Sequence, residues 1–108
     1  MALSTEQQAV KITFRYHELK CWPASFEALR SAQKKADFRR DDRGFEEGDL
    51  LIMQEWVPVL LGSEIGDYTG AILALRISHV ERGFGIPEGF AMLSVERFQD
   101  IVVEESNR

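Results

Sequence analysis

The sequence predicts a small β-rich α+β domain in which five or six strands curl into a pseudo-barrel, with one or two short helices. Apolar and polar residues alternate over several short segments, which is the period of a half-buried strand. Only one early segment, opened by a proline, has helical spacing. Glycines and prolines mark the loops between these segments, as turn chemistry requires. Many short strands with one apolar face are typical of a small barrel.

The length of 108 residues argues for one domain with a single core. We expect an N-terminal extension at residues 1–9, the domain at residues 10–103 and a polar tail at residues 104–108. No apolar run approaches the roughly 20 residues of a membrane-spanning helix, and the start lacks the pattern of a signal peptide. The single cysteine, Cys21, has no partner for an internal disulfide. We therefore expect a cytoplasmic protein without a membrane partner.

The first half of the chain predicts two strands around one helix. Residues 10–17 alternate as a strand does, and His17 lies near its end. A helix over residues 23–33 follows, with proline at its first position. An apolar stripe at i, i+4 and i+7 would pack this helix on the core; its members are Trp22, Phe26 and Leu29.

Residues 35–40 form a short, charged second strand in this interpretation, and residues 41–44 form a turn. In that turn, the Asp42 carboxylate would accept from backbone N–H groups and Arg43 would pair across it.

The second half predicts three strands. Residues 50–56 are apolar on both faces, which indicates a central strand, and residues 57–67 are expected to form a loop. The longest strand spans residues 68–80, with a bulge expected at Gly70. A glycine-rich loop at residues 83–89 leads into the last strand at residues 90–96.

The charge is unevenly distributed along the chain. The formal net charge is −5, but residues 30–43 carry six basic and three acidic side chains. A basic island on an acidic body suits the binding of one anionic group, rather than the coating of a long duplex. The alternative is an ordinary solvated face.

Several short motifs in one order resemble a known family. They are HELK at residues 17–20, WP at residues 22–23, KKADFRRDDRGF at residues 34–45, GD at residues 48–49, EW at residues 55–56, YTG at residues 68–70 and GFGIPEGF at residues 83–90. Together they resemble an uncharacterised family of small bacterial and phage proteins within the ASCH group of the PUA-like superfamily.

This resemblance implies a pseudo-barrel with a helix over one opening, and a suspected role in RNA binding. Some ASCH members look like hydrolases of modified nucleosides, and others like ribonucleases. The family's core motif falls here on Ala32, Lys34, Asp37 and Arg39. Two positions depart from it: Ala32 replaces a glycine, and Asp37 replaces the threonine proposed as nucleophile in the nucleoside hydrolases. A carboxylate is not activated as a hydroxyl is, which weakens the hydrolase interpretation.

Strand geometry gives the same residues a physical role. Residues 37 and 39 share one face of a strand, so Asp37 and Arg39 would point together into the barrel, with Lys34 reaching in from the helix end. The two cations suit a phosphate or a base carbonyl. The alternative is an internal salt bridge that closes one end of the barrel.

Three nearby residues complete the expected cleft. His17 offers a group that titrates near neutral pH, or a structural hydrogen bond. Lys20 offers a further cation, and Trp22 offers either base stacking or core packing. Cys21 is interpreted as a small buried residue. The two histidines, His17 and His79, and the cysteine do not have the spacing of a metal site.

We therefore expect a module that binds single-stranded RNA or a nucleotide-like ligand through His17, Lys20, Trp22, Lys34, Asp37 and Arg39. One alternative is a hydrolase of a modified nucleoside or a ribonuclease, with Lys34, Asp37 and Glu55 as catalytic candidates. Another is an accessory factor that binds proteins. No cofactor or metal is expected, and the oligomeric state is left open by the sequence.

Overall fold

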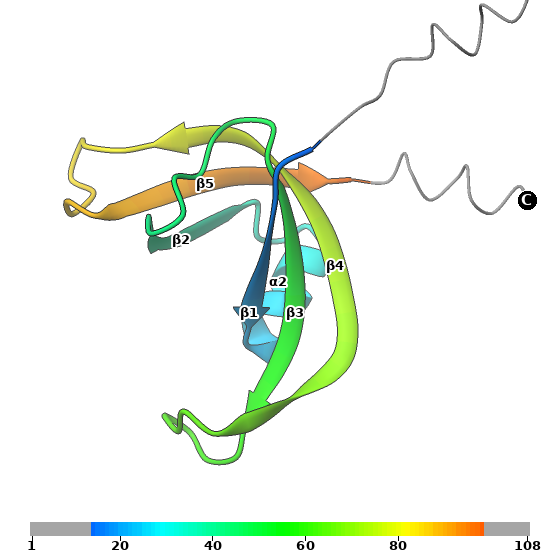
Figure 1. Cartoon of the computed structure of the whole chain (residues 1–108). Helices are drawn as coiled ribbons and strands as arrows, with labels where there is room; N and C mark the ends of the chain where they lie inside the picture. The colour runs from blue at the N-terminus through cyan, green and yellow to red at the C-terminus, as the bar shows by residue number, and fades with distance from the viewer. Residues whose placement is uncertain (1–13, 99–108) are drawn as a thin grey trace, which may run out of the picture.

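The computed structural model describes residues 14–98, which form one curled sheet and one short helix (Figure 1). The elements in chain order are β1 (Tyr16–Cys21), α2 (Pro23–Arg30), β2 (Ala36–Arg40), β3 (Leu50–Pro58), β4 (Gly66–Glu81) and β5 (Phe90–Arg97). The predicted five strands and early helix are thus confirmed, and β2, β3 and β5 lie within two residues of their expected bounds. No helix in this part of the chain has the length and apolarity to cross a membrane.

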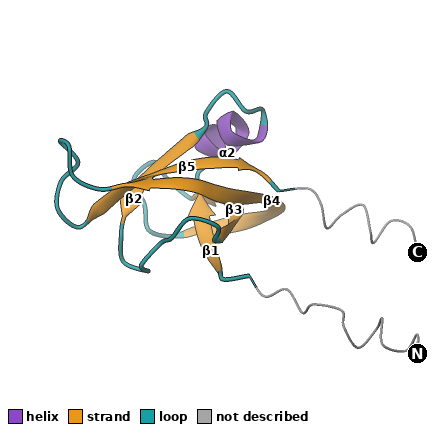
Figure 2. Cartoon of the chain, turned by 90° about the horizontal axis from the view of Figure 1, so that it is seen from above, coloured by secondary structure: helices purple, strands orange, loops and turns teal. Residues whose placement is uncertain are grey.

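The five strands form one sheet in the order β1-β3-β4-β5-β2. β1 runs parallel to β3, whereas the other neighbours are antiparallel. The sheet curls into a half-barrel whose two edges are β1 and β2 (Figure 1). α2 connects these two edges and packs against β3 on the concave side, as the view from above also shows (Figure 2).

The core fills the concave side of the half-barrel. α2 contributes Phe26 and Leu29 to it, and Phe45 packs there from the loop after β2. The strands contribute alternate residues, which is the period that the sequence showed. These residues are Leu19 and Cys21 of β1, Leu51 and Met53 of β3, Leu73, Leu75 and Ile77 of β4, and Ala91, Leu93 and Val95 of β5.

The first strand differs from its prediction. β1 begins at Tyr16 and continues to Cys21, so His17 lies near its start and not near its end. Residues 10–13 of the predicted strand, the extension at residues 1–9 and the tail at residues 104–108 lie outside the described residues. Residues 17–21 are held as a strand by pairing with the buried β3, which outweighs their own weak strand preference.

The helix and the hairpin after β3 also differ from prediction. α2 ends at Arg30 and not at residue 33, because Ala32 takes a left-handed backbone with φ of 66°. Residues 57–67 were expected to form a loop, but the ladder between β3 and β4 continues to the pair Pro58–Gly66. The bulge predicted at Gly70 is confirmed, because the β3–β4 register shifts between Gln54 and Trp56, opposite this glycine.

Candidate ligand-binding site

A cluster of polar side chains lies on the concave side of β2. Asp37 and Arg39 share that face, as predicted, and Arg39 Nε donates to Asp37 Oδ2 at 2.6 Å. The Asp37 side chain is only 6% exposed, whereas that of Arg39 is 24% exposed. A buried carboxylate of this kind requires a charged partner, and Arg39 supplies one.

Lys34 joins this cluster from the segment that follows α2. Its Nζ lies 4.0 Å from Asp37 Oδ1 and donates to Ser25 Oγ at 2.7 Å. The Lys34 side chain is 39% exposed, so its ammonium group still contacts solvent. Lys34, Asp37 and Arg39 therefore converge on one another, with Asp37 ion-paired to both cations, which is the internal salt bridge that the sequence left open as the alternative.

Cys21 completes the cluster at the end of β1. Its side chain is buried, as predicted. Burial raises the pKa of the thiol, and the negative charge of Asp37 acts in the same direction. A hydrogen bond with Ser25 and the charges of Arg39 and Lys34 oppose that shift. We refer to Cys21, Ser25, Lys34, Asp37 and Arg39 as the polar cluster.

The left-handed backbone of Ala32 sets the position of Lys34. It turns the chain back over the helix end, where Lys34 N–H donates to Ala28 C=O at 2.9 Å. This bond satisfies one of the carbonyls that a helix C-terminus leaves without a partner. Glycine adopts this conformation without strain, but the residue here is alanine.

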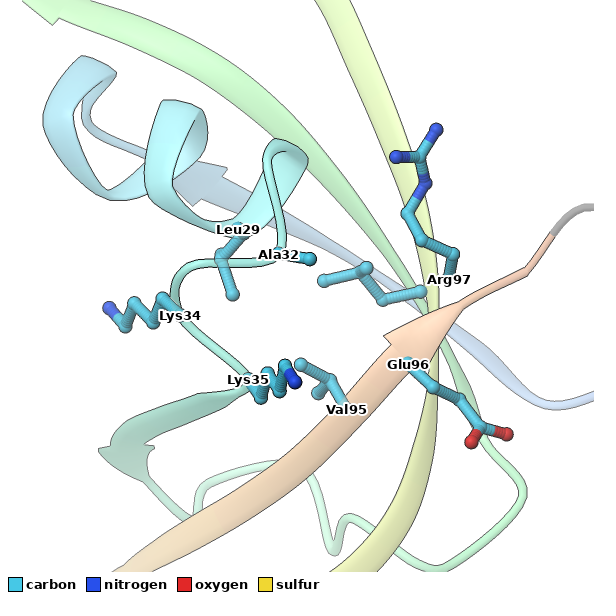
Figure 3. Close-up of a pocket in the computed structure, with 8 residues that line it drawn as sticks. Leu29, Ala32, Lys34, Lys35, Val95, Glu96 and Arg97 are labelled. Atoms are coloured by element: carbon cyan, nitrogen blue, oxygen red, sulfur yellow. The ribbon is translucent and has the colours of Figure 1, made fainter.

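A hollow of about 380 Å³ lies beside this helix end, between α2 and β5. Its lining combines apolar side chains with three cations and one acid; the residues are Leu29, Ala32, Lys34, Lys35, Leu75, Val95, Glu96 and Arg97. Figure 3 shows the Lys34 side chain pointing away from the hollow, so that its stem lines the hollow while its ammonium belongs to the polar cluster. We call this space the basic hollow.

Trp22 and Lys20 differ in whether their side chains are free to contact a ligand. Trp22 is 45% exposed, so the predicted packing of its ring in the core is wrong. It is the N-cap residue of α2, with φ of −71° and ψ of 155°, and therefore lies outside the helical stripe. Lys20 is exposed on β1, with its ammonium 4.0 Å from the centre of the Trp56 ring. Trp22 is available for stacking, whereas Lys20 is occupied by a cation–π contact.

His17 lies apart from the polar cluster. It precedes Cys21 by four residues on β1, which corresponds to about 13 Å along a strand. Its Nε2 lies 2.9 Å from Oδ2 of Asp49, and its ring packs against Phe45. Asp49 is itself buried and also accepts from Glu46 N–H. This is the structural hydrogen bond that the sequence left open as the alternative for His17.

Glu55 accepts a hydrogen bond from the Thr69 hydroxyl at 2.9 Å. Its register partner across the parallel β1–β3 pair is Cys21, so the two residues lie side by side at one end of the sheet. No ion pair or hydrogen bond joins Glu55 to Asp37 within residues 14–98. The three catalytic candidates are therefore not brought together as one group.

The turn after β2 uses a different carboxylate from the one predicted. Asp41, and not Asp42, accepts from the Phe45 backbone N–H. Asp41 also accepts from Arg82 Nε at 2.7 Å, and this bond holds the pKa of the Asp41 carboxyl below its usual value. Arg43 lies 3.9 Å from Asp42 and donates to the Glu18 carbonyl.

The sequence did not indicate three residues whose side chains form the contacts described above: Ser25, Asp49 and Arg82. Each contacts a partner at least nine residues away, and the contacts of Asp49 and Arg82 span more than thirty. The only signal for Asp49 was its place in the Gly48-Asp49 motif. Among the described residues, no three acidic, histidine or cysteine side chains converge as metal ligands would.

Comparison with known proteins places most of this structure within one family. A family model described as "Domain of unknown function (DUF3850)" matches residues 16–95, which include the polar cluster and most of the basic hollow. A protein of Escherichia phage P2, described as "Uncharacterized 12.9 kDa protein in GpA 3'region", is 36% identical over 66 residues. That alignment covers 61% of this chain and 54% of the phage protein, so the chain spans about half the length of the curated relative it matches.

Proposed function

The chain belongs to the DUF3850 family, and we propose that it is a module that binds single-stranded RNA or a nucleotide-like ligand. The binding site would consist of the polar cluster and the basic hollow. The observation that carries this proposal is the pair of partly exposed cations, Lys34 and Arg39, which a buried Asp37 fixes in place, while the stem of Lys34 lines a hollow of ligand size.

Asp37 orients Arg39 without using all of its donors. The bond at 2.6 Å uses Nε–H, and within residues 14–98 the two terminal nitrogens donate no hydrogen bond. A guanidinium with free terminal N–H groups suits a phosphate or a base carbonyl, because it presents two donors in one plane. Holding that plane before the ligand arrives reduces the entropy lost on binding.

The basic hollow supplies the second half of the proposed site. Its volume of about 380 Å³ lies in the range of small-ligand pockets, which is roughly 300–1,000 Å³. The apolar lining of Leu29, Leu75 and Val95 suits the face of a base or a ribose. Lys35 and Arg97 lie at the same hollow and suit a phosphate.

We also assign the fold to the PUA-like superfamily, and the chain to its ASCH group. The support is a curled sheet of five strands with a short helix between its two edge strands, together with the family's basic motif on Lys34 and Arg39. Ala32, at the position of that motif's glycine, has a left-handed backbone of the kind that glycine adopts without strain. Fold alone does not fix function, so the ligand assignment rests on the site.

The direct test is a fluorescence-anisotropy titration with a short single-stranded RNA at two salt concentrations. If four cations contact phosphate, affinity falls about fiftyfold between about 50 and about 200 mM salt, because the slope is about −0.7 per contact. Replacing Lys34 and Arg39 by Ala makes that slope less negative by about 1.4.

The matched control is Arg40→Ala, which removes the same charge from the exposed face of the same strand. Binding by this variant should equal that of the wild type. Absence of binding at low salt, or equal binding by the Lys34→Ala/Arg39→Ala variant, contradicts the proposal.

A second candidate function is hydrolysis of an acylated nucleoside, and one observation favours it. Lys34 Nζ lies 2.7 Å from the Ser25 hydroxyl, so a hydroxyl group lies against the lysine although the motif position holds Asp37. Deacylation of an acylated cytidine should then be lost in Ser25→Ala and in Asp37→Asn. A wild-type rate no higher than the rate without protein excludes this function for that substrate.

A further inference from the structure

The hairpin that joins β3 to β4 carries most of the exposed large apolar side chains of the described residues. Seven of the twelve such side chains lie within residues 57–72, and each is between 43% and 91% exposed. They are Val57, Val59, Leu60, Leu61, Ile65, Tyr68 and Ile72. We call residues 57–72 the apolar hairpin.

The apolar hairpin projects beyond the rest of the sheet. β1 pairs with β3 only as far as Cys21 and Glu55, so nothing in the described structure pairs with the outer edge of β3 past this point (Figure 1). Val57 and Val59 alternate onto one face of the hairpin, and Tyr68 lies on the other face as the partner of Trp56. Exposed apolar side chains therefore lie on both faces and at the tip, and Asp67 lies opposite Val57 on the first face.

The exposed surface is large enough to form one side of a stable interface. At the roughly 100 Å² of apolar surface that a fully exposed aliphatic side chain contributes, the seven residues expose about 450 Å². A standard interface buries about 800 Å² on each partner, of which about 60% is apolar. A partner that encloses both faces and the tip of the apolar hairpin would therefore cover about the whole apolar part of such an interface.

The charge of the hairpin excludes a phosphate-bearing partner. Residues 55–75 contain Glu55, Glu64 and Asp67 but no lysine, arginine or histidine. Nucleic acids and anionic membranes attract basic surfaces, so neither fits this one. We therefore argue for a protein partner with an apolar surface.

Backbone pairing to the free edge of β3 is also disfavoured. Val59 N–H donates to Ile65 C=O, so the neighbouring residue 58 would direct an N–H toward the open edge. That residue is Pro58, which has no N–H, and proline at an edge opposes the addition of a strand. An interface here must therefore be formed by side chains.

We propose that the apolar hairpin packs against the apolar hairpin of a second copy of this chain, across a two-fold axis. A two-fold interface uses the same patch on both subunits, so it requires a patch that complements itself. A hairpin with exposed apolar side chains on both faces and at its tip, which expose about half of the area that one partner buries in a standard interface, meets this requirement. The proposed dimer does not depend on the ligand site.

The test is sedimentation equilibrium of the full chain from about 1 to about 200 μM, the range in which a weak interface of standard size becomes populated. The wild type should sediment as a dimer at the upper end of that range. Leu60→Glu combined with Leu61→Glu should sediment as a monomer throughout, with an unchanged far-UV circular dichroism spectrum. These side chains are 71% and 91% exposed, so their replacement leaves the core intact.

Phe84→Glu is the matched control, because Phe84 is 95% exposed in a different loop. This variant should remain dimeric. Raising the salt concentration should tighten the dimer or leave it unchanged, since the charged residues within the apolar hairpin are acidic on both subunits. A monomeric wild type at every concentration, a dimeric Leu60→Glu/Leu61→Glu variant, or a dimer that dissociates with salt overturns the proposal.

Discussion

Removing Arg39 should destabilise the protein more than removing its partner Asp37, although Asp37 is the more buried of the two. After Arg39→Ala, a carboxylate that is only 6% exposed keeps Lys34 at 4.0 Å as its single cation. After Asp37→Ala, the two remaining cations are 24% and 39% exposed and can be hydrated. The two substitutions therefore leave charges in very different environments.

The magnitudes follow from that difference in burial. Leaving a buried charge without its partner costs about 3–5 kcal/mol, and we take the lower limit for Arg39→Ala because Lys34 remains nearby. Asp37→Ala loses a hydrogen bond between charged groups, which contributes about 2 kcal/mol. The double variant leaves no buried charge, so it should be about 1 kcal/mol more stable than Arg39→Ala alone.

Urea denaturation followed by tryptophan fluorescence measures these free energies of unfolding, because Trp56 is buried in the native state. Arg40→Ala serves as the control, and its free energy of unfolding should change by no more than about 0.5 kcal/mol. Additive losses in the double variant, or a larger loss for Asp37→Ala than for Arg39→Ala, would refute the assignment of Asp37 as a buried charge held by Arg39.

Three further predictions concern stability and reactivity. Ala32→Gly should raise the free energy of unfolding by about 0.5–1 kcal/mol in the same urea assay, because glycine adopts a φ of 66° without strain. Cys21 should react with iodoacetamide at least about tenfold faster in urea than in the native state, because burial raises the pKa of its thiol. The hydrogen bond from Arg82 lowers the pKa of Asp41 in the folded protein. This bond therefore stabilises the fold at pH values above 3.8, the pKa of Asp41 in the unfolded chain, and its contribution is lost as the pH falls through the pKa of Asp41 in the folded protein. The Arg82→Ala variant should lose this pH-dependent part of its stability in acid denaturation. An acid transition equal to that of the wild type would contradict this prediction.

Strands could be predicted from the sequence wherever successive residues alternate between a buried face and an exposed face. Asp37 and Arg39 share a face for that reason, and their common orientation followed from spacing alone. β1 was predicted to end at residue 17 and not at Cys21, because the alternation at residues 10–17 has apolar residues at even positions, whereas Leu19 and Cys21 are buried at odd ones. The pairing that selects this second phase is with β3, about thirty residues later in the chain.

The environments of two candidate site residues, Trp22 and His17, could not be predicted from the spacing of residues in the sequence. Trp22 has helical spacing to Phe26 and Leu29, but as the N-cap it has an extended backbone and its ring lies outside the apolar stripe. His17 and Asp49 are 32 residues apart, and only the parallel pairing of β1 with β3 brings them together. Local sequence therefore indicated which residues carry charge, whereas tertiary structure decided which of them form the site.

The most direct test of the proposed ligand site is a titration of the full chain with a uridine-rich RNA hexamer, followed by NMR. The Arg39 Nε–H resonance and the Lys35 amide should shift together and saturate, because these groups lie at the two halves of the proposed site. The His17 ring should be unaffected, since it is bonded to the buried Asp49. Shifts at His17 without shifts at Arg39 and Lys35, or no shift at any of them, would contradict the proposal that this site binds a nucleotide-like ligand.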